Sequence, residues 1–254
     1  MLRLRDGSKT ADRKLDRLVQ FDPKSREYPV TALLAAPPEK PRTWRLERAR
    51  MGDQRSEGAC TEFGLTHVLA ARPSPSSLAP IRVVRDRHLF YWEAQRRDPW
   101  EGGSYPGADP VYEGTSTLAV LQVAKELGFF GAYHWAFSLE QVVQGILDVG
   151  PAVLGLNWTT GMASPRPDGL IEATGPVDGG HCVAGIGIDH RRFGDGRVLD
   201  VVVIAQSWGL AHGDRGRVYL PLDQLGERLA DHGECAFVTR RTGLRALPAA
   251  ADPG

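Results

Sequence analysis

Short apolar runs crowd the second half of the chain, and they constrain its fold more than any other feature. Runs of this length, rich in Val and Ile and separated by Gly and Asp, predict β-strands. A last strand is predicted after a short helix over 223–233. The predicted strands are PAVLGLNW (151–158), HCVAGIGID (181–189), RVLDVVVIAQSW (197–208), RGRVYLP (215–221) and ECAFVTR (234–240).

The first half has the spacing of helices instead. Apolar residues recur at helical intervals in CTEFGLTHVLAA (60–71), and three further helices are predicted over 88–97, 116–128 and 138–150. Ser116 and Ser138 have the chemistry of N-caps for the last two. Helices in one half and strands in the other predict an α+β fold.

The length of 254 residues suits one large domain. We expect this domain to span 29–244, with a helical lobe over about 53–150 and a β lobe over about 151–244. A polar arm, residues 1–28, precedes it and a tail, residues 245–254, follows it, and we expect both to be flexible.

Composition excludes several classes of function. Lys and Arg together number 31, as do Asp and Glu, and no basic stripe is interleaved with aromatic residues, so we expect no nucleic acid partner. No apolar run is long enough to cross a membrane, and the charged N-terminus has no secretion signal. Three cysteines, an odd and sparse set, favour a reducing compartment. We therefore expect a cytoplasmic protein without a membrane partner.

Four residues have the chemistry of a thiol active site. Cys60 opens a predicted helix, whose N-terminal N–H groups favour the thiolate nucleophile. Gln54, in the preceding loop, can direct its side-chain amide toward the sulfur as an oxyanion donor. His181 begins a strand and is the candidate general acid and base, and Gln206 ends another strand and can orient the imidazole.

These segments resemble the motifs of the papain-like (C1-type) cysteine peptidases. DQRSEGACTEF (53–63) is similar to that family's nucleophile motif, GGHCVAGIGID (179–189) to its histidine motif, and AQSWGLAHGDRGRVYL (205–220) to its N-S-W-G motif. The resemblance implies a two-lobe fold, with Cys60 on the helical lobe and His181 on an antiparallel, barrel-like β lobe. It also implies hydrolysis of peptide or isopeptide bonds through a thioester, with no cofactor and no metal.

The same resemblance assigns supporting roles to Trp208, which would shield the His181–Gln206 contact from water, and to Gly58 and Gly180. The Arg-rich, Asn-poor composition points to a bacterial or phage-like member. The 59 residues before Cys60 are too few for a long inhibitory prosegment, so we do not expect that form of zymogen control.

The sequence also departs from the family pattern. Gln206 stands where the family has Asn, and Thr61 and Glu62 replace an aromatic–small pair. Two other functions therefore stay open: acyl transfer or amidase activity on a protein, and a weak or inactive module that binds a peptide or partner. His181 with Cys182 and His232 with Cys235 suggest zinc, but neither pair has the usual ligand spacing. Substrate preference and oligomeric state are left open.

Overall fold

The computed structural model describes residues 3–4, 14–35, 41–72 and 83–241, so the expected tail 245–254 and most of the first 13 residues lie outside it. The α-helices are α1 (Cys60–Ala70), α2 (Val83–Arg97), α3 (Thr117–Glu126), α4 (Leu139–Asp148) and α5 (Leu222–Ala230). Short 3-10 helices span Pro23–Glu27, Val30–Ala32 and Arg48–Arg50. The strands are β1 (Arg3–Leu4), β2 (Arg17–Leu18), β3 (Arg42–Thr43), β4 (Tyr112–Glu113), β5 (Thr115–Ser116), β6 (Phe130–Ala136), β7 (Ala152–Thr159), β8 (Val177–Arg192), β9 (Val198–Ala205), β10 (Arg217–Pro221) and β11 (Glu234–Arg241).

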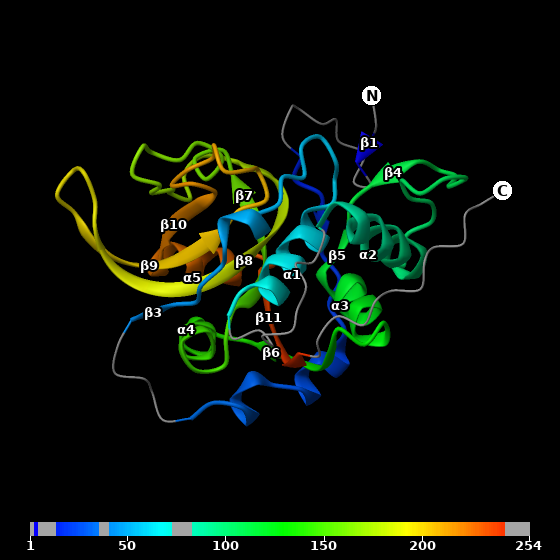
Figure 1. Cartoon of the computed structure of the whole chain (residues 1–254), viewed down its shortest axis with the longest axis horizontal. Coiled ribbons are helices and arrows are strands. Elements are labelled where there is room, and N and C mark those ends of the chain that lie inside the picture. Colours follow the sequence, from blue (N-terminus) through cyan, green and yellow to red (C-terminus); the bar gives the residue numbers. More distant parts are fainter. Residues whose placement is uncertain (1–2, 5–13, 36–40, 73–82, 242–254) are drawn as a thin grey trace.

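One antiparallel sheet organises the molecule. Its strand order is β10-β9-β8-β7-β11-β6, and β3 pairs with the outer part of β8. Figure 1 shows β9 and β10 of this sheet on the left, helices α2 and α3 on the right, and α1 between them. The mixed composition confirms the expected α+β class. The edge strand β6 precedes residue 150, so the sheet takes in residues from before the expected lobe boundary.

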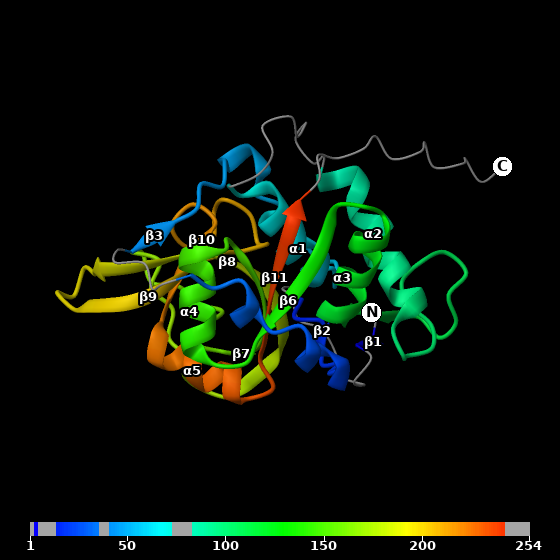
Figure 2. The same cartoon turned by 90° about the horizontal axis from the view of Figure 1, so that it is seen from below.

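Both faces of the sheet are buried, which explains the near-continuous apolar runs in the sequence. Alternate residues of a strand point to opposite faces. On β9, Val201, Val203 and Ala205 therefore join one core with helices α1, α2 and α3. Val202 and Ile204 join a second core with α4 and α5. Figure 2 shows α4 and α5 on one side of β11 and β6, with α2 and α3 on the other.

Local signals set the helix starts that position the site. The hydroxyl of Ser116 accepts a hydrogen bond from the Ala119 amide, and that of Ser138 accepts one from the Gln141 amide. Both are side-chain N-caps, as the sequence predicted. Helix α1 begins at Cys60, also as predicted. Among the described residues, no helix is long and apolar enough to cross a membrane.

Candidate active site

Cys60 lies at the first residue of α1, where the helix packs directly on β8. The packing is close because Gly64 has no side chain: a Cβ there would lie 2.9 Å from Sγ of Cys182. The thiol of Cys60 is completely buried, and a backbone amide of Cys182 contributes to its electrostatic environment. The structure therefore places the candidate nucleophile beside the residue that follows His181.

His181 and Gln206 contact each other as the sequence predicted. Nε2 of His181 is 2.7 Å from Oε1 of Gln206, and both residues are buried. The same Oε1 accepts a hydrogen bond from the Ser207 amide at 2.9 Å, which fixes it as the amide oxygen. An oxygen can only accept here, so Nε2 of His181 carries the hydrogen and Nδ1 holds the lone pair.

Trp208 covers this hydrogen bond, as expected. Its ring stacks on the His181 ring with centroids 4.8 Å apart and planes 19° from parallel, and Trp158 meets the imidazole edge-on at 5.0 Å. Nδ1 of His181 is buried and, within the described part of the chain, has no hydrogen-bond partner. Cys60 therefore lies beside Cys182, the neighbour of His181, and among the described residues no hydrogen bond joins its thiol to Nδ1.

Gln54 is buried at the same place and is held from both ends. Its Nε2 donates to the carbonyls of Glu57, at 2.9 Å, and Lys14, at 3.2 Å. Its backbone amide donates to the Ser207 carbonyl at 2.7 Å, and its Oε1 accepts from the Ser207 hydroxyl. Ser207 therefore links Gln54, the candidate oxyanion donor, to Gln206, a contact that sequence reasoning missed.

A stretch of the N-terminal arm, residues 14–18, lies in a groove over the site. Four glycines form walls that leave room for it. A Cβ added at Gly180 would lie 2.1 Å from the Arg17 carbonyl oxygen, and one at Gly114 would lie 2.4 Å from the Asp16 carbonyl oxygen. Likewise, a Cβ at Gly58 would meet the Asp16 carboxylate at 2.3 Å, and one at Gly179 would meet Leu15 at 2.9 Å. Gly58 and Gly180, expected to support the site, thus border the groove.

Strand pairing and ion pairs hold residues 14–18 in this groove. Strand β2 runs parallel to β5, with Arg17 opposite Thr115, and Asp16 forms a bridge with Gly180 on the other wall. The Lys14 ammonium pairs with the Glu113 carboxylate. The Arg17 guanidinium lies 3.5 Å from Glu234. Local sequence did not predict the burial of residues 14–18, because they form a charged stretch typical of an exposed arm.

Burial sets the protonation of the site. It raises the pKa of Cys60 to about 12; the nearby Asp16 charge acts in the same direction, and backbone amides and the Arg17 charge oppose it. Burial also lowers the pKa of His181 to about 3, although its bond to Gln206 opposes this. Both groups are therefore neutral at pH 7. This differs from the thiolate expected at a helix N-terminus, because desolvation outweighs the favourable helix end.

Other residues that the sequence analysis singled out are buried in the fold and contribute to its packing. Glu62 is buried and accepts a hydrogen bond from the Tyr91 amide at 3.1 Å, so it joins α1 to α2. Cys182 and Cys235 are buried in the two separate cores. No group of three or more His, Cys, Asp or Glu among the described residues is arranged to hold a metal ion.

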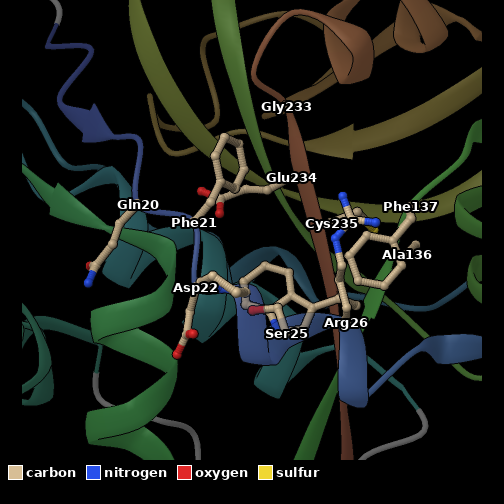
Figure 3. A pocket seen from close by; sticks show the side chains of 12 residues that line it. Gln20, Phe21, Asp22, Ser25, Arg26, Ala136, Phe137, Gly233, Glu234 and Cys235 are labelled. Carbon is tan, nitrogen blue, oxygen red and sulfur yellow. The ribbon is translucent and has the colours of Figure 1, made fainter.

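A cavity of about 410 Å³ lies beside the groove, where the arm crosses β6 and β11. Figure 3 shows Gln20, Phe21 and Asp22 of the arm on its left and Ala136 and Phe137 on its right. Glu234, which pairs with Arg17, is also part of its wall. Glu234, at the start of β11, therefore contacts Arg17 and also lines the cavity.

Comparison with known proteins identifies the fold. No protein-family model and no curated protein matches the sequence. Among solved structures, the cysteine protease xylellain from Xylella fastidiosa is 13% identical, with a TM-score of 0.59 over 94% of this chain and 100% of that chain. Digestive procathepsin L 3 from Tenebrio molitor larvae is also 13% identical, with a TM-score of 0.53 over 90% and 76% of the two chains. A structure from a study of the mite allergens Blo t 1 and Der p 1 is 16% identical, with a TM-score of 0.51 over 88% and 75%. The chain has the two-lobe fold of the papain-like cysteine proteases.

Proposed function

We propose that this protein is a cysteine peptidase that hydrolyses peptide or isopeptide bonds through a thioester on Cys60. The observation that carries this proposal is the hydrogen bond between His181 and Gln206. The Ser207 amide fixes the orientation of the Gln206 side chain, so the lone pair of His181 Nδ1 is available. His181 precedes Cys182, the residue of β8 that packs on Cys60. A base held in one tautomer beside a thiol is what nucleophilic catalysis requires.

The reaction uses these groups in two stages. Nδ1 of His181 takes the thiol proton, and the Cys60 thiolate attacks the carbonyl carbon of the substrate. The imidazolium then protonates the leaving amine, and the acyl group stays on sulfur. In the second stage His181 removes a proton from water, which attacks the thioester and releases the acid. Gln206 and Trp208 hold the imidazole throughout.

Gln54 and the backbone amide of Cys60 are the proposed oxyanion donors. Nε2 of Gln54 already donates to a peptide carbonyl, that of Lys14, at 3.2 Å. This contact supports the assignment, because it indicates that a carbonyl oxygen fits in front of the donor. The orientation of the Gln54 amide is also fixed in advance by Ser207, and a donor that needs no reorganisation stabilises a transition state best.

Substrate can reach the thiol only when residues 14–18 leave the groove. Cys60 and His181 are each 0% exposed with the segment in place. The described state is therefore closed, and the active form is an open one in which water and substrate replace the segment. Rehydration removes the desolvation that keeps both groups neutral, so an imidazolium–thiolate pair becomes accessible on opening.

The same burial favours a second candidate, a papain-fold module without catalysis that binds a peptide or partner. In that case the neutral thiol and imidazole are simply core groups. A transferase or amidase would share the thioester of the peptidase and differ only in the acceptor that receives the acyl group.

Turnover by the full chain separates these functions. We expect cleavage of a denatured protein and of a fluorogenic peptide mixture by the wild type, and none by Cys60→Ala. Gln54→Ala should lower kcat by about 10²–10³-fold, with a cooperative melting transition as the check on folding. Acyl products formed with an added amine, measured by mass spectrometry, would identify transfer. If the wild type and Cys60→Ala are equally inactive, and neither hydrolysis nor transfer occurs, the catalytic proposal is wrong.

A further inference from the structure

A buried histidine, His67, lies on the helix that carries Cys60, and the proposed reaction does not use it. It falls in the largely apolar stretch THVLAA (66–71), and its exposed fraction is 0%. Seven residues separate it from Cys60, which is close to two turns of an α-helix, so both side chains lie on the same face of α1. Gly64 lies between them on this face and allows α1 to approach Cys182 on β8. His67 therefore belongs to the side of α1 that packs on the sheet.

The imidazole of His67 accepts a hydrogen bond from outside its helix. The backbone amide of Gly52 donates to Nε2 at 2.8 Å, and both residues are buried. A ring nitrogen that accepts a hydrogen bond carries no hydrogen, so the hydrogen of the neutral ring is on Nδ1. Burial lowers the pKa of His67 to about 4. The ring is therefore neutral at pH 7 and keeps the lone pair that this bond needs.

A second segment of the chain faces the same ring. The backbone carbonyl of Ala205, the last residue of β9, interacts with the imidazole of His67 and acts to raise its pKa. A carbonyl has this effect because it favours a ring N–H, and Nδ1 is the nitrogen that carries one here. Within the described residues Nδ1 has no partner in hydrogen-bond geometry, so the Gly52 amide makes the stronger contact.

Both contacts of His67 lead directly into the candidate site. Gly52 stands two residues before Gln54, and Ala205 stands immediately before Gln206. The helix that begins with the candidate nucleophile thus meets, at one side chain, the loop of the candidate oxyanion donor and the strand of the candidate orienting residue. No other part of the proposed mechanism assigns a role to this meeting point.

The position of Gln54 depends on anchors on both sides of the cleft between the lobes. Its own backbone amide donates to the Ser207 carbonyl at 2.7 Å, which holds it to the β lobe. Gly52, two residues earlier, is held to α1 by His67. Without the imidazole lone pair, the Gly52 amide would be a buried donor with no acceptor, which is costly enough to shift the loop toward water or another acceptor.

We propose that His67 is a positioning residue, which through Gly52 fixes the place of the Gln54 amide relative to the Cys60 thiol. The inference rests on the proposed peptidase function and adds a residue to the same site. His67 acts on the rate through Gln54 and does not contact the substrate. A ring packed on a helix suits this role, because groups held by rigid elements keep a catalytic geometry better than loops that contact only each other.

The test is a double-mutant cycle on kcat, measured on the full chain at saturating fluorogenic peptide. Saturation removes competition by residues 14–18, which raises KM and leaves kcat unchanged. His67→Leu removes the acceptor and should lower kcat by about 10–100-fold, since a catalytic group displaced by about 1 Å loses rate on this scale. In the Gln54→Ala background the same replacement should lower kcat by less than about threefold, because the donor that it would displace is already absent.

Two further variants separate positioning from stability. His67→Gln keeps an acceptor oxygen, so its kcat should stay within about threefold of the wild type. Thr66→Val is the matched control: it also removes a buried hydrogen bond, from the Thr66 hydroxyl to the Phe63 carbonyl, but this bond stays within α1. Thr66→Val should leave kcat unchanged even where its melting temperature falls as far as that of His67→Leu.

The outcomes distinguish the two proposals. Equal losses of kcat from His67→Leu in the wild-type and Gln54→Ala backgrounds, or no loss in either, would overturn the positioning role and retain the peptidase. Absence of turnover in the wild type would refute the peptidase, and the positioning role with it. If His67→Leu does not fold, His67→Asn takes its place in the cycle, because its shorter amide should not reach the Gly52 amide, and the same results decide.

Discussion

Replacement of Arg17 by Ala should uncover the candidate active site of the full chain. Arg17 is the part of residues 14–18 that is anchored by buried acceptors, the Glu234 carboxylate and the His232 carbonyl. Without the guanidinium, the segment keeps its backbone pairing with β5 and its Lys14–Glu113 ion pair. The closed state should therefore become less favoured while the fold of the body is retained.

The size of the effect follows from the contacts that are lost. A hydrogen bond to a charged group contributes about 1.5–3 kcal/mol. The guanidinium of Arg17 lies 3.2–3.5 Å from its two acceptors, the His232 carbonyl and the Glu234 carboxylate. These distances are long, so each hydrogen bond should contribute an energy at the lower end of that range. The total is about 3 kcal/mol, and since about 1.4 kcal/mol is a factor of ten, the open fraction should rise by about 100-fold.

The assay is the rate of Cys60 alkylation by iodoacetamide at one fixed pH, followed by intact-mass spectrometry. Since Cys60 is 0% exposed, it reacts only from the open state, and its rate is proportional to the open fraction. Cys60→Ala identifies the labelled position, because Cys182 and Cys235 are also buried. Arg26→Ala is the matched control, an exposed arginine of the same arm that lies outside the groove.

We expect faster alkylation in Arg17→Ala and an unchanged rate in Arg26→Ala. Two results would refute the reasoning. One is wild-type labelling as fast as that of a small thiol peptide, which would mean that residues 14–18 do not cover Cys60 in solution. The other is an equal rate in Arg17→Ala and the wild type, which would mean that the buried contacts do not hold the segment.

Two further predictions concern the histidines and Gln206. Burial lowers the pKa of His181 to about 3 and of His67 to about 4, both below the usual 6.5. The unfolded chain therefore binds more protons below pH 6.5, and the free energy of unfolding should fall by about 2 kcal/mol per histidine between pH 7 and pH 5. Urea titrations measure this; His67→Gln should lose about half of the drop, and a flat profile would contradict the assignment. Gln206→Ala should lower kcat by about tenfold or more, since His181 loses a buried hydrogen bond of about 1–1.5 kcal/mol and its fixed orientation. Gln206→Asn, whose amide is one methylene shorter, should recover only part of kcat, and full activity in Gln206→Ala would show that the bond does not position the base.

The α-helices and the long strands after residue 150 followed from local sequence because their causes are local, whereas the strand β6 was not predicted. Ser116 and Ser138 cap their helices through bonds within three residues, and such a pattern is visible without any tertiary information. Residues 201–205 of β9 form a continuous apolar run without alternating polar residues, because both faces of the sheet are covered. The contact of His181 with Gln206 was predicted through the family resemblance, which supplies the tertiary arrangement that the residues alone do not.

The place of residues 14–18 could not be predicted in this way. Lys14 and Arg17 are charged, and a charged stretch near a terminus ordinarily remains hydrated. Their burial depends on Glu113 and Glu234, which lie 99 and 217 residues away in the sequence. Ser207 was missed for a related reason. Its hydroxyl is one of many in the chain, and its role appears only when Gln54 is brought to it by the fold.

The glycine walls of the groove constrain how this protein can evolve. Gly58, Gly114 and Gly180 each leave space that a single methyl group would fill, and the proposed substrate would need the same space as the arm. A larger side chain in the walls would therefore displace the arm only by also blocking the proposed substrate. Natural or laboratory selection for a faster-opening form should accumulate changes in residues 14–17, whereas these three glycines should stay invariant.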